Sequence, residues 1–254
     1  MSFSDYKSDY DRDGFVIVRD FLPAADFADL NDSLDRYIRD VVPNLPDADA
    51  FYQEKDRPET LKQMQNMAGN DPFFADYRQH PRWSELAEAL IGEPAESQGT
   101  EWFNKPPNTV HPTPPHQDNY YFNMKPPHSC TLWLALDPID EENGCLRYAV
   151  GSHKGGIRPH GSTSVLGFSQ GVSDYGPDDE ATEAVIELNA GDVAVHHCEI
   201  IHRADPNVSA TRSRRAFAMV YYGESCRLDE KAHRRYLESA RKQHTSMGLV
   251  SSLT

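Results

Sequence analysis

The apolar residues of the N-terminal third recur mostly at helical spacing. Between Pro23 and Pro43 they stand three or four positions apart, which predicts a helix bounded by the two prolines. The same spacing predicts a second helix over residues 60–68 and a third over about 81–91. Residues 14–18 are instead rich in β-branched and aromatic side chains and predict a short strand.

The pattern changes after Gly92. Short apolar runs separated by Pro, Gly and Asn clusters predict strands at 101–103, 130–136, 146–150, 184–188, 192–196 and 215–222. Many short strands with turns between them are typical of a β-sandwich or jelly roll. Together with the helices that precede them, they indicate an α+β fold with a mainly β core, braced on one face by the N-terminal helices.

No composition shift marks a domain boundary, so we expect a single domain over residues 1–254. Its predicted parts are helical support mostly at 20–92, a jelly-roll core at about 95–223 and a C-terminal helix at 229–243. Residues 154–183 interrupt the strand pattern, because they are rich in Gly and Ser and contain few apolar side chains. A loop of this length is usually a functional lid or is disordered.

Composition narrows the class of partner. The 254 residues carry a net charge of -15, so no excess of Lys and Arg is present to neutralise the phosphates of a nucleic acid. The four cysteines are scattered without a Cys-x-x-Cys motif, no secretory signal opens the chain, and no apolar run is long enough to span a bilayer. We therefore expect a cytoplasmic protein that acts on a small molecule, with no nucleic-acid or membrane partner. The sequence does not indicate an oligomeric state.

The main chemical candidate is His116-Gln117-Asp118. On an extended strand, side chains two positions apart lie on the same face, so His116 and Asp118 can aim at one point. These two ligands and a distant His make a 2-His-1-carboxylate site for ferrous iron, which leaves coordination positions open. The tripeptide alone is a weak signal. Downstream, His196, His197 and His202 are candidates for the third ligand, although a single His in an apolar strand is more often a hydrogen-bonded core residue.

The ordered set of motifs resembles the phytanoyl-CoA dioxygenase family of iron(II)- and 2-oxoglutarate-dependent oxygenases, which have a double-stranded β-helix (jelly-roll, cupin-like) core. The resemblance runs from about Gly14 to Tyr222. The motifs that carry it are His116-Gln117-Asp118, Leu132-Trp133-Leu-Ala-Leu136, Glu142-Asn143-Gly144-Cys-Leu146, Gly151-Ser152-His153, Gly191-Asp192, His202 with Asn207 and Ser209, and Arg214-Arg215.

The resemblance implies that the metal ligands are His116, Asp118 and His202. It also implies that an Arg about eleven residues after the last ligand pairs with the distal carboxylate of 2-oxoglutarate. Position 213 is Ser in this chain, and we expect Arg214 to take that role. Arg212 and Arg215 are the alternatives, and alternation on a strand allows only one of two adjacent arginines to point inward.

Further site residues are expected from their places in the family pattern. Thr131, Trp133 and Lys105 are expected near the cosubstrate, with Trp133 as plain core an equal alternative. Gln117, Asn119 and Tyr120 flank the ligands and are expected near the substrate, whereas Tyr121 and Phe122 fit packing equally well. His153 is expected to support a turn, and His160 to be solvated.

The implied reaction is the hydroxylation of an unactivated C–H bond of a small metabolite, with Fe(II), 2-oxoglutarate and O2 as the cofactors and with release of succinate and CO2. Asp118 favours hydroxylation over halogenation, since related halogenases have a small residue in its place. The alternatives are a jelly-roll metal dioxygenase that does not use 2-oxoglutarate and a non-catalytic binding protein on the same fold. The substrate is not indicated by the sequence.

Overall fold

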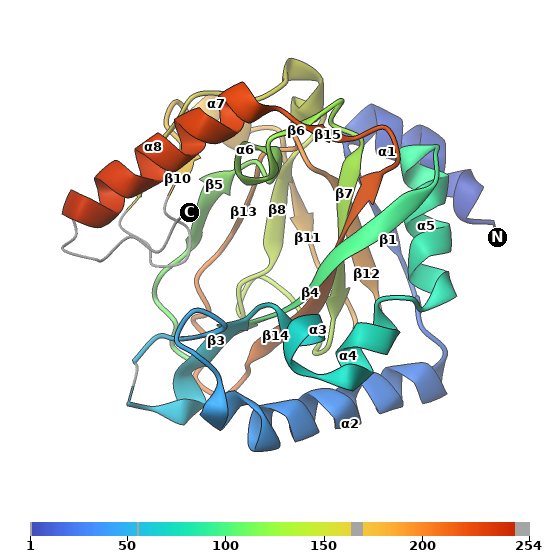
Figure 1. Ribbon diagram of the computed structural model, residues 1–254, viewed down its shortest axis with the longest axis vertical. Helices are drawn as coiled ribbons and strands as arrows, with labels where there is room; N and C mark the ends of the chain where they lie inside the picture. The colour runs from blue at the N-terminus through green and yellow to red at the C-terminus, as the bar shows by residue number, and fades with distance from the viewer. Residues whose placement is uncertain (1, 55, 164–169, 247–254) are drawn as a thin grey trace.

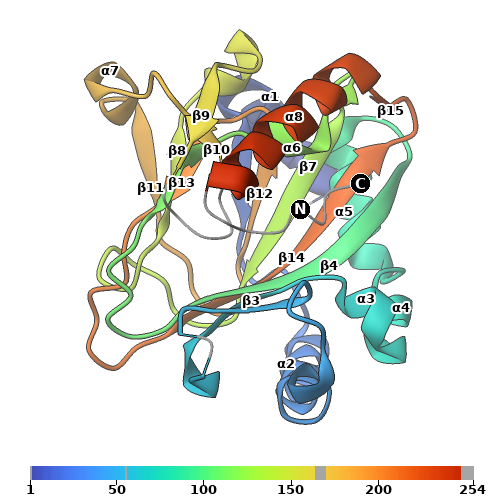
Figure 2. The same ribbon diagram turned by 60° about the vertical axis from the view of Figure 1, so that its left-hand side comes forward.

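Two main antiparallel sheets and a set of covering helices form the part of the chain that the computed structural model describes, residues 2–54, 56–163 and 170–246 (Figures 1 and 2). The strands are β1 (Phe15–Val18), β2 (Ala50–Tyr52), β3 (Leu61–Met64), β4 (Ala95–Lys105), β5 (Thr113–His116), β6 (Met124–Lys125), β7 (Ser129–Ala135), β8 (Leu146–Ala149), β9 (His160–Ser162), β10 (Gln170–Val172), β11 (Glu183–Ile186), β12 (Val193–His197), β13 (His202–Ala204), β14 (Arg214–Gly223) and β15 (Arg227–Leu228). The helices are α1 (Lys7–Asp13), α2 (Ala24–Asp40), α3 (Met67–Asn70), α4 (Pro72–Tyr77), α5 (Pro81–Ile91), α6 (Asn119–Phe122), α7 (Pro177–Glu180) and α8 (Glu230–Ser246), with 3-10 turns η1 (Phe3–Tyr6), η2 (Val42–Asn44), η3 (Pro58–Thr60) and η4 (Ser152–Gly155).

The larger sheet has seven strands in the order β1-β12-β7-β14-β4-β3-β2, and the smaller has four in the order β11-β8-β13-β5. Side chains from both sheets share one apolar cluster, which includes Trp133 and Ala216 from the larger sheet and Tyr148 and Ile186 from the smaller. The two sheets therefore pack face to face as a β-sandwich with this cluster as the core between them, and a cavity adjoins that core. Short pairs β9–β10 and β6–β15 are attached outside this arrangement.

Strand β7 is a nearly continuous apolar run in the sequence because both of its faces are covered. All seven of its residues are buried. Cys130, Leu132 and Leu134 pack outward against the cluster formed with the helices, whereas Trp133 and Ala135 belong to the inner cluster. A strand that is covered on both faces needs no polar alternation.

The outer face of the larger sheet is covered by helices, most directly by α5 (Figure 1). This helix begins with Pro81 after the cap His80, whose imidazole accepts a hydrogen bond from the Arg82 backbone N–H. It ends at Gly92, whose φ of 92° is the left-handed conformation that glycine adopts without strain. Its buried stripe of Trp83 and Leu86 contributes to the cluster that lies against the sheet.

Most predicted elements are present. The strand at 14–18 is β1, the helix after Pro23 is α2, the helix at 81–91 is α5, and the C-terminal helix is α8. The Asp229 carboxylate accepts hydrogen bonds from the Lys231 and Ala232 backbone N–H groups at 3.0 Å and caps α8 as expected.

The predicted helix at 60–68 is wrong. Residues Leu61–Met64 form strand β3, which pairs Gln63 with Phe103 and Met64 with Trp102 and lies between β4 and the edge strand β2 of the larger sheet. Apolar residues three positions apart fit a turn of helix and an irregular strand equally well. Pairing with β4 decides between them, because it supplies backbone hydrogen-bond partners that local propensity does not encode.

The region 154–183 has more structure than the predicted loop. Strands β9 and β10 pair within it, α7 follows, and β10 lies beside β5. The Tyr121 hydroxyl donates to the Gln170 carbonyl at 2.5 Å and fixes β10 to the segment that follows β5. Residues 164–169 lie outside the described residues, so the lid stays a prediction there. Within the described part of the chain, no helix has both the length and the apolar character to cross a membrane.

Substitution Leu86→Ala tests the packing of α5 on the sheet. Leu86 is fully buried, so we expect the free energy of unfolding to fall by about 2–5 kcal/mol, through lost apolar burial and the cavity left behind. Denaturant unfolding measures the change. Glu85→Ala on the exposed face of the same helix is the control and should change the value by less than about 0.5 kcal/mol. Equal effects of the two substitutions would contradict this packing.

Candidate metal centre

His116 ends β5 and His202 begins β13, and the two residues are direct partners in the antiparallel pair. Cross-strand partners present their side chains on the same face, and the two imidazole centroids lie 4.1 Å apart. Each Nδ1–H donates to a backbone carbonyl two residues earlier, Pro114 at 2.8 Å and Ile200 at 3.2 Å. Both rings are therefore fixed in orientation with Nε2 left as the donor atom for an ion.

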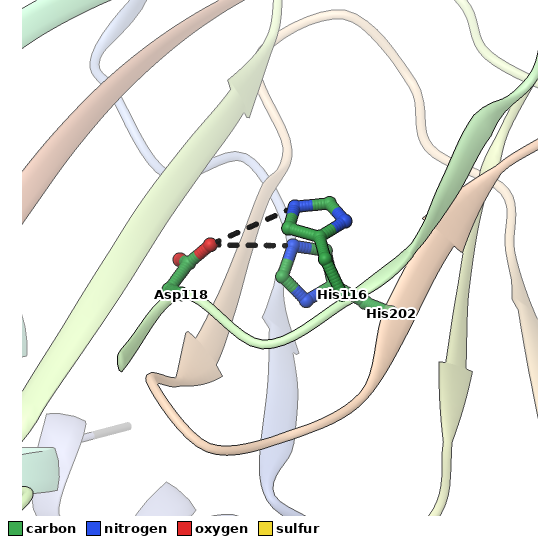
Figure 3. A group of neighbouring side chains, drawn as sticks. All are labelled: His116, Asp118 and His202. Atoms are coloured by element: carbon green, nitrogen blue, oxygen red, sulfur yellow. Dashed lines mark ion pairs between the residues drawn. The ribbon is translucent and has the colours of Figure 1, made fainter. Parts of the chain in front are cut away.

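Asp118 reaches the same point by a turn. The strand stops at His116, and Asp118 has helical backbone angles (φ -57°, ψ -40°) as the residue that precedes α6. The expectation that His116 and Asp118 share the face of one strand is thus wrong, although the two side chains do converge. Asp118 Oδ1 lies 3.8 Å from His116 Nε2 and 3.6 Å from His202 Nε2 (Figure 3).

The second carboxylate oxygen of Asp118 is held by the larger sheet. Thr131 on β7 donates its hydroxyl to Asp118 Oδ2 at 2.6 Å, and His196 on β12 donates Nε2–H to the same atom at 3.1 Å. The Tyr148 hydroxyl in turn donates to His196 Nδ1 at 2.8 Å. His196 is thus a hydrogen-bonded core residue that orients the carboxylate, as its place in an apolar strand indicated.

The charges at this cluster suit a divalent cation. Burial lowers the pKa of His202 well below its ordinary value, and the neighbouring His116 and His196 add to the shift. Burial also lowers the pKa of His116. Burial alone would raise the pKa of Asp118, but the three imidazoles outweigh it and hold that pKa far below the usual range. Neutral imidazoles beside an ionised carboxylate are the protonation states that metal binding requires.

The donor set fits ferrous iron. Within the described residues, His116, Asp118 and His202 are the group of His, Cys, Asp or Glu side chains whose ligand atoms all lie within 4.8 Å of one another. Two imidazoles and one carboxylate are the donors of the facial 2-His-1-carboxylate site. His197 lies elsewhere: its Nδ1 accepts from the Glu199 backbone N–H, and its ring packs near Tyr10 and His153.

The cluster opens on a cavity of about 530 Å³ between the two sheets. Arg214 lines this cavity, is 4% exposed, and has its guanidinium carbon 5.1 Å from the centroid of the Trp133 ring. Burial lowers the pKa of Arg214 to about 10, so the side chain stays charged at neutral pH. Its Nε atom is buried and has no hydrogen-bond partner among the described residues. A buried cation with an unused donor fits the distal carboxylate of 2-oxoglutarate.

Lys105 lies beside Arg214, since the two residues are partners in the pairing of β4 with β14. The Lys105 ammonium is buried and donates to the Ala204 carbonyl at 3.1 Å and to the Asp205 carbonyl. Burial lowers the pKa of Lys105 well below its usual value, and the positive charge of Arg214 lowers it further. An anion bound between the two side chains would stabilise both charges.

The alternative arginines are engaged elsewhere. Arg212 forks the Asp140 carboxylate at 2.5 and 2.9 Å, and Arg215 pairs with Asp137 at 2.7 Å. Neither is among the described residues that line the cavity. The inward and outward alternation expected for Arg214 and Arg215 is present.

Comparison with known proteins fits this geometry. The sequence profile of the phytanoyl-CoA dioxygenase (PhyH) family matches residues 10–216. The chain belongs to this family. The predicted class, an Fe(II)- and 2-oxoglutarate-dependent oxygenase, is thereby confirmed at the level of the family.

Peroxisomal phytanoyl-CoA dioxygenase of Rattus norvegicus is 27% identical over 95% of this chain and 76% of its own length. A probable alpha-ketoglutarate-dependent hypophosphite dioxygenase of Stutzerimonas stutzeri is 24% identical over 87% and 78%.

Among solved structures, the non-heme alpha ketoglutarate dependent carbocyclase SnoK from nogalamycin biosynthesis superposes with a TM-score of 0.71. The two chains are 21% identical, and the match covers 91% of this chain and 89% of that one. At this identity the likeness speaks for the fold alone. It confirms the predicted double-stranded β-helix.

Three residues expected near the substrate of this PhyH-family chain do not line the cavity in its described part: Gln117, Asn119 and Tyr120. Gln117 is fully buried and donates its amide to the carbonyls of Gly156 and Glu199. Asn119 donates to the Met124 carbonyl, and Tyr120 stacks on His160 with the ring centroids 3.9 Å apart. The chain turns after His116, and these side chains take other partners; their contact with a substrate stays a prediction.

His160 is also not the solvated residue we expected. Its ring is half-buried against Tyr120, its Nε2 accepts the Gln117 backbone N–H at 3.3 Å, and burial lowers its pKa to about 4. His153, by contrast, supports a turn as expected, with its Nε2–H donating to the Asp11 carbonyl at 3.2 Å.

The cavity wall also contains residues that the sequence reasoning missed. They include Glu101 and Phe103 on β4 and Gln63 on β3. Alternation on β4 puts residues 101, 103 and 105 on one face, so Lys105 was a signal for the other two. Tyr121 and Phe122 line the cavity as well.

Substitution Thr131→Val tests how the carboxylate is held. It removes the hydroxyl that donates to Asp118 Oδ2 and keeps the volume nearly unchanged, so we expect Fe(II) affinity to fall by about 10- to 100-fold. Anaerobic calorimetric titration with Fe(II) measures the change. Thr100→Val is the matched control, because the buried Thr100 hydroxyl has no hydrogen-bond partner within the described ranges. Wild-type affinity in Thr131→Val would show that this hydrogen bond does not support the ligand.

Proposed function

We propose that this chain is an oxygenase that binds Fe(II) through His116, Asp118 and His202 and uses 2-oxoglutarate to hydroxylate a small molecule in the adjoining cavity. When bound, the iron and 2-oxoglutarate supply the oxidising power, drawn from O2 as 2-oxoglutarate is converted to succinate and CO2. The observation that carries the proposal is Arg214, a buried cation with an unpartnered Nε in the same cavity as the ligand cluster.

Separate groups of residues around the cavity hold the iron, the cosubstrate and the substrate in this proposal. His116 and His202 present neutral Nε2 atoms, while Thr131 and His196 hold the Asp118 carboxylate in place. Arg214 and Lys105 form a positive end of the cavity that orients a dicarboxylate by its far end. Trp133, over which Arg214 lies, lines the same cavity as the ligands. The remaining volume is available to the substrate.

Arg214 favours this function over the two alternatives. A metal dioxygenase that does not use 2-oxoglutarate has no need of a buried cation in the same cavity as its metal ligands. A binding protein has no need of a carboxylate held by two donors with two oriented imidazoles around it. Asp118 further supports hydroxylation over halogenation, since its carboxylate fills the space that a halide would need. The cytoplasmic location stays a prediction.

The direct test is anaerobic addition of Fe(II) and 2-oxoglutarate to the purified chain. We expect a visible metal-to-ligand charge-transfer band that neither component gives alone. On admission of air, succinate should form, and a screen of small metabolites should find compounds that accelerate its formation. The absence of the band at saturating Fe(II) and 2-oxoglutarate would contradict the proposal.

Substitution Arg214→Gln tests the cosubstrate end of the cavity. It replaces the charged guanidinium fork with a shorter, neutral amide, so the affinity for 2-oxoglutarate should fall at least about thirtyfold, because loss of one partner of a buried charge pair costs about 2 kcal/mol or more. Titration of the charge-transfer band measures it. Arg212→Gln, whose side chain is paired at the surface, should titrate like the wild type. Unchanged binding in Arg214→Gln would refute this assignment.

A further inference from the structure

The cavity contains a carboxylate that the proposed chemistry does not use. Glu101 lies on β4, is partly buried and lines the cavity together with Phe103 and Gln63. Its cross-strand partner on β14 is Ala218, whose next partner on β7 is Trp133. The small side chain of Ala218 leaves space between Glu101 and Trp133.

Glu101 lacks a counter-ion in the part of the chain that the structure describes. Its described hydrogen bond comes from the Gln63 side-chain amide at 3.4 Å, a long contact between a neutral group and an acid. Among the described residues, no Lys, Arg or His forms an ion pair with Glu101. Two of the cations that line the same cavity have other partners: Lys105 donates to backbone carbonyls, and Arg203 donates to both oxygens of the Glu183 carboxylate.

Comparable carboxylates elsewhere in this protein are treated differently. Asp71 is forked by Arg36, Asp137 by Arg215, and Glu183 by Arg203. An acid removed from water without such a partner is costly. Burial accordingly raises the pKa of Glu101 to about 7, and the negative charge of Asp118 adds to that shift. A cation placed beside Glu101 would remove this penalty.

Glu101 is not a further metal ligand, because it is outside the group whose ligand atoms lie within 4.8 Å of one another. The strand register gives the distance between Glu101 and the ligand cluster. Glu101 on β4 is level with Trp133 on β7, two strands away and so about 10 Å across the sheet. Thr131, which holds Asp118, lies two residues from Trp133 along β7. Arg214 is four residues from Ala218 on β14, about 13 Å along the strand. The acid is therefore separate from both the cation end and the ligands, yet one small molecule can reach from Glu101 to the iron position.

We propose that Glu101, oriented by Gln63, binds a positively charged amino group of the substrate, so that the substrate class is small amine-bearing molecules. This inference rests on the proposed oxygenase function, since it assigns the substrate of that same cavity. The amino group would give the Glu101 carboxylate the counter-ion that it lacks. It would also hold the rest of the molecule toward His116 and His202.

The test uses matched pairs of compounds with wild-type protein, Glu101→Gln and Glu96→Gln. Glu96 lies on the same strand but is exposed, so its substitution is the control. Amino acids and primary alkylamines are each assayed beside their N-acetyl derivatives, which lack the charge. We expect at least one amine to stimulate succinate formation more than tenfold over its acetylated partner. Glu101→Gln should reduce that stimulation at least tenfold, and Glu96→Gln should not.

A second readout does not depend on turnover. Calorimetric titration of the stimulating amine into the metal-free protein should show binding that weakens at least tenfold in Glu101→Gln. That variant should keep the charge-transfer band with Fe(II) and 2-oxoglutarate, and loss of the band would overturn the inference by placing Glu101 with the cosubstrate.

Two results separate this inference from the proposed function. If the wild type gives the charge-transfer band but no amine exceeds its acetylated partner, or Glu101→Gln responds like the wild type, the inference alone fails. If the wild type gives no band, the proposed oxygenase function is wrong, and so is the inference that rests on it.

Discussion

The Asp118 carboxylate links polar side chains of the two sheets. One oxygen faces His116 and His202 of the smaller sheet, and the other accepts hydrogen bonds from Thr131 and His196 of the larger sheet. A buried carboxylate is stable only if its lone pairs are satisfied. The spacing of the sheets, the turn after β5 and the rotamers of four side chains are thus all constrained by one group. The cavity beside this group is lined on β14 by the small side chain of Ala218.

The chain separates its charges within that cavity by strand position. Inward-facing residues of β4 and β14 place Lys105 and Arg214 at one end and Glu101 with Ala218 nearer the ligands. Because the rise per residue is fixed at about 3.3 Å, the distance between unlike charges is set by counting positions along two strands. In the proposed function, this spacing would allow one cavity to orient the cosubstrate and the substrate by their charged ends.

Much of the fold follows from local pattern. Long periodic segments such as α2 and α5, and the continuous apolar run of β7, need no tertiary information, and the order of motifs was enough to select His202 from three candidate histidines. The helix expected at 60–68 failed because Leu61 and Met64 fit both structures and the edge of β4 decides. The sequence did not indicate that Gln117, Asn119 and Tyr120 lie outside the cavity lining, because proximity in sequence to a ligand does not set the direction of a side chain after a turn. Glu101 was not predicted because the expectation for Lys105 was not extended along the strand to residues 101 and 103, which alternation puts on the same face.

The direct pairing of His116 with His202 has a consequence for folding. Strand β13 lies between β8 and β5, and a slip of one residue against β5 would move His202 to the opposite face. The two imidazoles then no longer share a side, and the three donors cannot converge. An ion that binds only the converged donors stabilises the correctly paired state by mass action. The ligand cluster thus acts as a thermodynamic check on strand alignment as well as a site for chemistry.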